Sequence, residues 1–186
     1  MSSTRRNTPR LAPLPTDEWD DETRALLGGA QPINIFGTLA HHPKLMKRWL
    51  VFGNHVLAKS TLTARDRELL ILRAGWNCRA PYEWGQHVAI ARAVGVTDEE
   101  VERIAVGPDA PGWDAFDATL LRAADELHTT QDITDATYAA LAERYDAQQL
   151  LDVVFTVGQY QLVSRVLNPL RVDRDDGVTG VPIPER

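Results

Sequence analysis

Apolar residues recur at spacings of three and four along most of this chain, which is the periodicity of amphipathic α-helices. Leu45, Trp49, Phe52 and Val56 show it clearly over one stretch. No stretch alternates apolar and polar residues for long enough to build a sheet. The pattern therefore predicts an all-α fold.

Capping and turn residues divide this pattern into separate helices. Thr63, Thr97 and Thr134 stand where N-caps are expected, and Pro81 suits the first turn of a helix. The last segment is apolar on more than one face, so we expect it to be buried on two sides, within the bundle or at a subunit contact. The helices are predicted over residues 17–27, 32–42, 45–56, 63–78, 81–94, 98–104, 113–129, 135–141 and 147–167.

The two ends of the chain differ in composition from its middle. Residues 1–16 contain three prolines among small and basic residues, which predicts an irregular tail that orders only against a partner surface. Residues 171–186 are charged and rich in Gly and Pro, which predicts an extended tail. Because 186 residues is close to the usual size of one domain, we assign residues 17–170 to a single all-helical domain.

Charge and hydropathy argue against two classes of partner, nucleic acids and membranes. The formal charge is -6, the pI is about 5.3, and the basic residues are scattered, so no nucleic-acid partner is expected. No window is apolar for long enough to form a membrane helix, and no apolar region follows Arg5 and Arg6 as in an export signal. We expect a cytoplasmic protein without a membrane partner.

The strongest chemical signal is Glu83 with His87, four positions apart and so on one helical face. A neighbouring carboxylate raises the proton affinity of an imidazole and selects which nitrogen carries hydrogen, as a general acid or base requires. The alternative is a helix-surface pair worth about 0.3 kcal/mol.

Glu68 follows an apolar stripe that continues through Ile71, Leu72 and Gly75. A glutamate on such a face is expected to be buried, which tunes its acidity. The small residue Gly75 would let a neighbouring helix come close beside it. The alternative for Glu68 is a salt bridge to Arg65, three residues earlier.

Cys78 is the only cysteine, so the chain cannot form an intramolecular disulfide or a multi-cysteine zinc site. It lies near the end of one predicted helix and just before the next, with Arg79 beside it. Both a reactive thiolate and an inert, buried thiol are compatible with this position.

These residues lie in a pattern that resembles the carboxymuconolactone decarboxylase family of the alkylhydroperoxidase D-like superfamily. The resemblance covers roughly residues 34–170. It implies an all-helical bundle built on an antiparallel helix hairpin, assembled as a homo-oligomer (dimer, trimer or hexamer) with the site near a subunit boundary, and no cofactor. The matching stretches are Arg67–Arg73, Cys78, Tyr82–His87, Ile90–Arg92 and Gly95–Thr97.

Within that superfamily, the peroxidase branch uses Cys-x-x-Cys-x-x-x-His with an upstream Glu. His87 and Glu68 match the histidine and the upstream acid, but Ala80 and Glu83 stand where the two cysteines would be, and Cys78 is out of register. Because a dithiol cycle needs two cysteines, the resemblance favours the decarboxylase branch.

We therefore expect a proton-transfer enzyme, a lyase, that acts on a small carboxylated lactone or another enolisable carbonyl compound. His87 would move the proton. Glu83 would orient the His87 imidazole and favour its protonated, charged form, and Glu68 would serve as a second acid or base. Arg73 or Arg79 would bind a substrate carboxylate. The expected substrate-binding residues are Trp76, Tyr82, Trp84 and Tyr160.

Three alternatives remain. Glu-x-x-x-His with one more carboxylate could ligate iron or manganese, but a single histidine makes a metal site the weaker hypothesis, and none is expected. Cys78 could act as a peroxidase thiol that an external thiol or a second subunit resolves. The chain could also be a non-catalytic helical oligomer that retains only the fold.

Overall fold

The computed structural model describes residues 8–175 and 181–185, and over these residues the chain forms helices and no strand. This confirms the all-α class. The elements are a 3-10 turn η1 (Thr16–Glu18) and the helices α1 (Asp21–Ala25), α2 (Asn34–Leu39), α3 (Pro43–Ala58), α4 (Ala64–Asn77), α5 (Pro81–Ala93), α6 (Asp98–Val106), α7 (Ala115–Thr129), α8 (Asp135–Ala142) and α9 (Ala147–Leu170).

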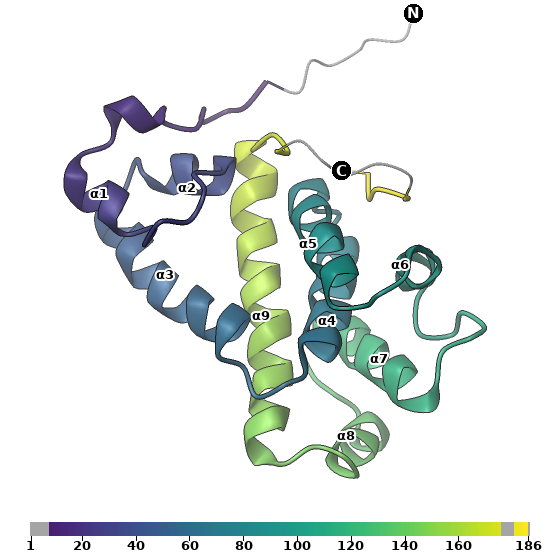
Figure 1. Ribbon diagram of the computed structural model, residues 1–186. Helices are drawn as coiled ribbons and strands as arrows, with labels where there is room; N and C mark the ends of the chain where they lie inside the picture. Colours follow the sequence, from purple (N-terminus) through teal and green to yellow (C-terminus); the bar gives the residue numbers. More distant parts are fainter. Residues whose placement is uncertain (1–7, 176–180, 186) are drawn as a thin grey trace, which may run out of the picture.

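Helix α4 is the centre of the bundle. Its residues from Glu68 to Gly75 are all buried, and it packs against α5, α7 and α9. Figure 1 shows α4 beside the long α9, with α7 and α8 towards the lower end. The consecutive apolar residues Leu69 to Leu72 point to all sides of the helix, so this stretch must be covered on every side, which explains its position.

The connection from α4 to α5 is a tight reversal, as the helix-hairpin prediction requires. Arg79 adopts a left-handed conformation (φ 49°), and Pro81 begins α5. Asn168 of α9 donates hydrogen bonds to the carbonyls of Cys78 (2.8 Å) and Arg79 (3.2 Å). At Gly75 a Cβ would lie only 3.7 Å from the Cβ of Glu83, so the two helices approach closely there, as expected.

Several caps agree with the sequence. Thr63 and Thr134 accept hydrogen bonds from the backbone three residues on, and Thr97 forms a capping box with Glu100. The first helix was predicted wrongly: Asp20 caps a short α1, because its carboxylate accepts from the Thr23 N–H at 2.7 Å.

Two other boundaries also differ from prediction. Helix α2 runs from Asn34 to Leu39 and is shorter than the predicted 32–42. Pro43 begins α3, where its missing N–H has no helical partner to lose.

Helix α9 is one turn longer than predicted and ends where Arg171 adopts a left-handed conformation (φ 55°). One face, with Val157 and Val163, lies in the core. The opposite face exposes Phe155 and Leu162, with exposed fractions of 52% and 50%. Burial on two sides, as predicted from the sequence, is therefore not achieved within this chain.

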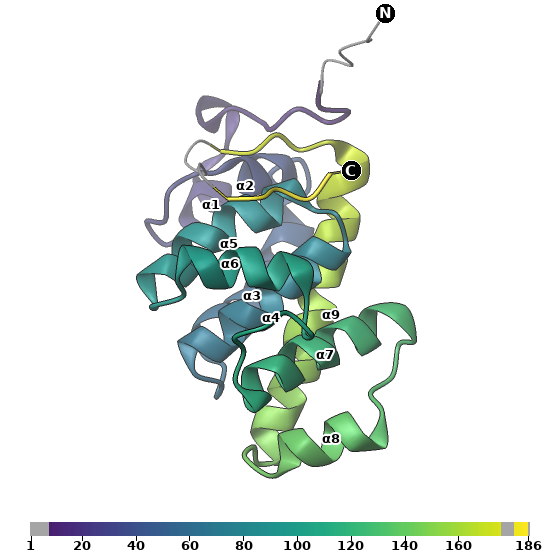
Figure 2. The same ribbon diagram turned by 90° about the vertical axis from the view of Figure 1, so that its right-hand side faces the viewer.

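The segment before α1 packs against its own chain. Leu14 donates its N–H to the carbonyl of Gly37 (2.9 Å), and a Cβ on Gly37 would meet Pro13 at 2.8 Å, so only glycine allows this approach. After α9 the chain turns back (Figure 2), and Asp175 accepts a hydrogen bond from Tyr82 in the first turn of α5. The predicted tail residues 1–7, 176–180 and 186 lie outside the described part.

No helix in the described ranges combines the length and the apolar content that crossing a membrane requires.

Candidate functional site

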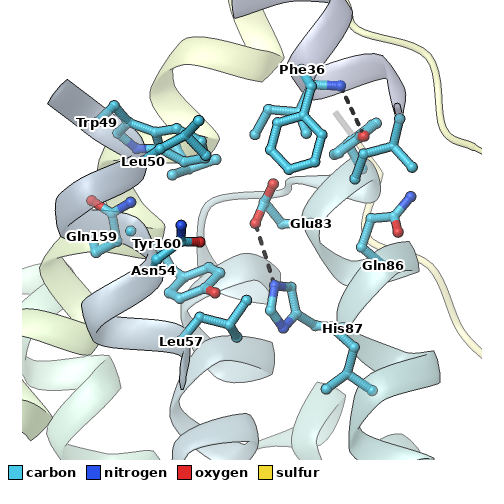
Figure 3. Close-up of a pocket in the computed structure, with 16 residues that line it drawn as sticks. Phe36, Trp49, Leu50, Asn54, Leu57, Glu83, Gln86, His87, Gln159 and Tyr160 are labelled. Atoms are coloured by element: carbon cyan, nitrogen blue, oxygen red, sulfur yellow. Dashed lines mark hydrogen bonds and ion pairs between the residues drawn. The ribbon is translucent and has the colours of Figure 1, made fainter. Parts of the chain in front are cut away.

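A cavity of about 140 Å³ lies among helices α2, α3, α5 and α9. Most of its wall is aliphatic and aromatic. Polar side chains enter it from α5 (Glu83, Gln86 and His87), from α3 (Asn54) and from α9 (Gln159). Figure 3 shows the Glu83 carboxylate and the His87 ring on one side of this space and the two amides of Asn54 and Gln159 on the other.

His87 is held by Glu68, which reaches it from α4. The His87 Nδ1 lies 2.8 Å from Glu68 Oε2, and Glu68 is fully buried. Because a carboxylate only accepts hydrogen bonds, Nδ1 carries the hydrogen and Nε2 is left to face the other way. Arg67 contacts the second Glu68 oxygen at 3.3 Å.

The alternative prediction, a salt bridge between Glu68 and Arg65, is wrong. Arg65 instead pairs with Glu100 at 2.8 Å and with Asp117 at 2.5 Å, on another side of α4. Glu68 therefore remains available to hydrogen-bond His87.

Glu83 lies on the Nε2 side of the imidazole, at 3.8 Å from Glu83 Oε2. Its side chain is buried, and this burial raises the pKa of Glu83 to about 7, against the opposing attraction of His87. A carboxyl group with this pKa exchanges protons readily at neutral pH. The four-residue spacing thus does bring Glu83 and His87 together, although the close hydrogen bond to His87 comes from Glu68.

Two of the four predicted wall aromatics line the cavity. Tyr160 places its ring edge-to-face against His87, with centroids 4.7 Å apart, and burial raises the pKa of its hydroxyl far above the usual range. Tyr82 is anchored: its hydroxyl donates to Asp175 (2.6 Å) and accepts from the Ile35 N–H (3.0 Å).

The other two predicted aromatics, Trp76 and Trp84, do not line the cavity, so this part of the prediction is wrong. Trp84 is completely buried in the main core, with Trp76 packed against it at a centroid distance of 5.0 Å. Each residue along a helix turns by about 100°. Trp84, one position after Glu83, therefore points into the core instead.

Cys78 also lies outside the cavity wall. Its thiol is half-buried, 3.8 Å from the Nδ1 of His128, and burial raises the pKa of the thiol. A higher pKa lowers the thiolate fraction at neutral pH.

The arginines proposed to bind a substrate carboxylate are placed elsewhere. Arg73 makes two contacts to Asp125 (2.5 and 2.9 Å) and donates to the carbonyl of Ile104 (2.7 Å). Arg79 is exposed, and neither arginine lines the cavity. The two arginines instead line a separate pocket, together with Trp76.

Sequence reasoning missed Asn54, Gln86, Gln159 and Asp175. Asp175 accepts a hydrogen bond from Gln86 (2.9 Å) as well as from Tyr82, so the segment after α9 holds two wall residues. Gln159 precedes Tyr160 in a long, largely apolar helix. A polar residue at such a position is the sequence signal that could have identified Gln159 as a site residue. Within the described residues, no group of three or more His, Cys, Asp or Glu side chains is arranged to hold a metal ion.

The comparisons agree with this architecture. The sequence profile of the carboxymuconolactone decarboxylase family matches residues 43–126, which includes Glu68, Glu83 and His87. The central part of the chain, from the start of α3 into α7, is therefore similar to this family. The match is shorter than the predicted resemblance over residues 34–170, and α9 lies outside it. A search of curated proteins finds no match.

Solved structures share the fold at low sequence identity. An uncharacterized peroxidase-related protein from Silicibacter sp. TM1040 superposes with a TM-score of 0.79 at 18% identity, over 94% of this chain and 96% of the other. An AhpD-core protein from Ralstonia eutropha JMP134 gives 0.77 at 19%, over 89% and 93%. The debrominase Bmp8 gives 0.74 at 13%, over 89% and 91%.

Proposed function

We propose that this chain is a proton-transfer enzyme of the carboxymuconolactone decarboxylase type that acts on a small enolisable carbonyl compound. The observation that carries the proposal is the set of contacts from Glu68 to His87 and from His87 to Glu83. The carboxyl group of Glu83 lines the cavity and has a pKa of about 7. General acid–base catalysis is most efficient when the pKa of the catalytic group is near the working pH.

In the proposed reaction, the Glu83 carboxylate takes a proton from the carbon next to the substrate carbonyl. The C–H bond breaks, its electron pair moves into the carbonyl group, and an enolate forms. The proton on Glu83 then returns to a carbon of the enolate, or exchanges with solvent through His87 Nε2. Glu68 is a positioning residue that keeps hydrogen on Nδ1.

The lining favours an uncharged carbonyl compound over a carboxylated lactone. A substrate carboxylate would sit beside Glu83 without a counter-charge, since Arg73 is paired with Asp125 and Arg79 is outside the cavity. Two neighbouring carboxylates in a buried site repel each other and are costly to desolvate.

The test is double-bond migration in a neutral β,γ-unsaturated γ-lactone, followed by NMR in D2O. We expect the wild type to move the double bond into conjugation and to incorporate deuterium at the reacting carbons. His87→Ala should lower kcat by about 100-fold, because the proton relay is broken. His128→Ala, which changes a histidine outside the cavity wall, should retain wild-type kcat.

Two outcomes would contradict the proposal: no exchange with any neutral lactone or ketone, or unchanged turnover in His87→Ala. A preference for the carboxymethyl derivative of the same lactone would contradict the choice of an uncharged substrate.

A peroxidase that uses Cys78 is the second hypothesis, because two of the similar structures are described as peroxidase-related. The raised pKa of the Cys78 thiol and its position outside the cavity wall speak against it. Peroxide consumption with an external thiol tests it: this hypothesis requires activity in the wild type that Cys78→Ser abolishes.

A further inference from the structure

Tyr160 carries a buried hydroxyl group that no described residue hydrogen-bonds. The exposed fraction of Tyr160 is only 6%. The other two buried tyrosines are paired. The Tyr82 hydroxyl donates to Asp175, and the Tyr145 hydroxyl donates to Asp66, each at 2.6 Å. A buried tyrosine hydroxyl normally has such a partner, because leaving it unpaired costs free energy. Tyr160 is therefore the exception among the buried tyrosines.

The Tyr160 hydroxyl lies in the cavity, beside the acid–base residues. Tyr160 is part of the cavity wall, and its ring packs edge-to-face against His87 with centroids 4.7 Å apart. Figure 3 shows the hydroxyl end of this ring directed towards His87, in the space that Glu83 also borders. A small substrate beside the His87 ring can therefore contact the Glu83 carboxylate and a neutral O–H donor at the same time.

We propose that the Tyr160 hydroxyl donates a hydrogen bond to the carbonyl oxygen of the substrate and stabilises the enolate oxygen that forms from it. This rests on the proposed function. In that step the C–H bond breaks, the proton goes to Glu83, and the electron pair moves to the carbonyl oxygen. An O–H donor that is already in place interacts more strongly with the negative oxygen than with the neutral carbonyl.

The closeness of Tyr160 to Glu83 suits an enolisable carbonyl compound. The acidic carbon of such a compound is bonded directly to the carbonyl carbon, so the base and the donor to oxygen must lie near each other. Tyr160 and Glu83 meet this condition because both contact the imidazole of His87. Burial, and then the charges of Glu83 and Glu68, hold the pKa of the Tyr160 hydroxyl well above its usual value. The hydroxyl therefore keeps its proton at neutral pH and acts only as a donor.

Charge balance in the cavity explains why an uncharged donor is sufficient. The negative charge appears on the substrate oxygen as the proton neutralises Glu83, so the total charge of the cavity stays the same. A lysine or arginine in place of Tyr160 would instead favour the carboxylate form of Glu83 and weaken it as a base. The substrate class is therefore an uncharged ketone, ester or lactone whose carbonyl oxygen faces Tyr160 while its acidic carbon faces Glu83.

The first test compares Tyr160→Phe with Tyr145→Phe in the lactone assay. Both substitutions remove one buried hydroxyl and keep the ring, but Tyr145 does not line the cavity. Tyr160→Phe should lower kcat by about 100-fold and change KM much less, since the lost hydrogen bond strengthens only as the enolate forms. Tyr145→Phe should retain the wild-type kcat. Equal kcat in Tyr160→Phe and the wild type would overturn the role of Tyr160 and leave the proposed function standing.

Urea denaturation of the same two variants separates a catalytic role from a structural one. The Tyr160 hydroxyl has no partner to lose, so the midpoint of unfolding of Tyr160→Phe should equal or exceed that of the wild type. Tyr145→Phe removes the donor to the buried Asp66 and should unfold at lower urea. A loss of stability in Tyr160→Phe as large as in Tyr145→Phe would assign the hydroxyl to packing and overturn the proposal.

A second test needs no turnover and uses 4-nitrophenol, whose phenolate resembles an enolate and absorbs visible light. If the Tyr160 hydroxyl donates to the bound oxygen, the pKa of the bound probe should be about one unit higher in Tyr160→Phe than in the wild type. The same pKa in both proteins would overturn the role of Tyr160. A Tyr160-dependent pKa without any lactone exchange would support the oxyanion site and refute the proposed function.

Discussion

At the scale of single residues, Glu83 is the group whose burial has the largest consequence. Its pKa rises because the carboxylate has left water, and His87 at 3.8 Å offsets only part of that cost. The closer contact to His87 comes from Glu68 at 2.8 Å. The two glutamates therefore suit different roles, with Glu68 orienting the imidazole and Glu83 exchanging protons.

Burial of Glu83 predicts an unusual pH dependence of stability. Its folded-state pKa of about 7 lies above the ordinary value of 4.5, so between these pH values the folded protein binds more protons than the unfolded chain. The contribution of Glu83 to the free energy of unfolding should fall as pH rises from about 4.5 through 7, and then level off. Glu83→Gln should therefore be more stable than the wild type at pH 8, by at most about 3 kcal/mol, and similar at pH 4.

Urea denaturation at several pH values measures this difference, and the lactone assay gives the matching activity. Glu83→Gln should lose most of its turnover while gaining stability, which is the opposite of what a structural carboxylate would show. Lower stability of Glu83→Gln at pH 8 would contradict the burial argument. Glu143→Gln, an exposed carboxylate beyond the end of α8, is a control that should change neither quantity.

At the scale of elements, the α4–α5 hairpin brings Glu68 together with Glu83 and His87. Glu68 comes from α4, and Glu83 and His87 come from α5, so their distances depend on how the two helices meet at Gly75. The segment after α9 adds a second constraint. Asp175 accepts hydrogen bonds from Tyr82 and Gln86, and also from the Asn34 N–H at the start of α2 at 3.1 Å.

The Asp175 contacts predict a measurable effect on the wall of the cavity. Asp175→Asn keeps the size of the side chain but removes its charge, which weakens hydrogen bonds that a carboxylate accepts. We expect the free energy of unfolding to fall by about 1 kcal/mol and KM for the lactone to rise. Denaturation and steady-state kinetics measure these changes.

Asp109→Asn is the matched control for Asp175→Asn. It breaks an exposed pair with Arg122 (2.9 Å), which should contribute little to stability. If the two variants had the same stability and the same KM, Asp175 would have no special role.

At the scale of the whole molecule, α3 and α9 leave apolar side chains at the surface. Phe52 and Phe155 stack edge-to-face with centroids 5.9 Å apart, and their exposed fractions are 39% and 52%. Along α9 the exposed apolar positions continue with Leu151, Val154, Leu162 and Val166. Contiguous apolar surface of this kind is typical of interaction sites. We propose that a second copy of this chain covers it, which gives the expected homo-oligomer a specific face.

Sedimentation of the wild type and of Phe155→Asp tests this face. The wild type should be oligomeric, and Phe155→Asp should weaken self-association by about tenfold or more, because a charge would be buried at the contact. Tyr138→Asp is the matched control: Tyr138 is equally exposed (54%) but lies on α8, so its substitution should leave the oligomer intact. A monomeric wild type would rule out the assembly.

The sequence by itself determined the helical class, most helix starts and the pairing of Glu83 with His87 on one helical face. These follow from local rules: a period near 3.6, threonine caps such as Thr63, and the four-residue spacing of Glu83 and His87. Short N-terminal helices were predicted less well, because their ends depend on packing as much as on caps.

Only the tertiary structure decided which side chains share the cavity. Glu68 meets His87 across a helix pair, 19 positions apart, and Gln159 and Asp175 reach the site from the far end of the chain. Trp84 and Arg73 lie close in sequence to site residues and yet face the core or Asp125. Periodicity gives the face of one helix, but the helix that covers this face is chosen by long-range packing, which no local pattern encodes.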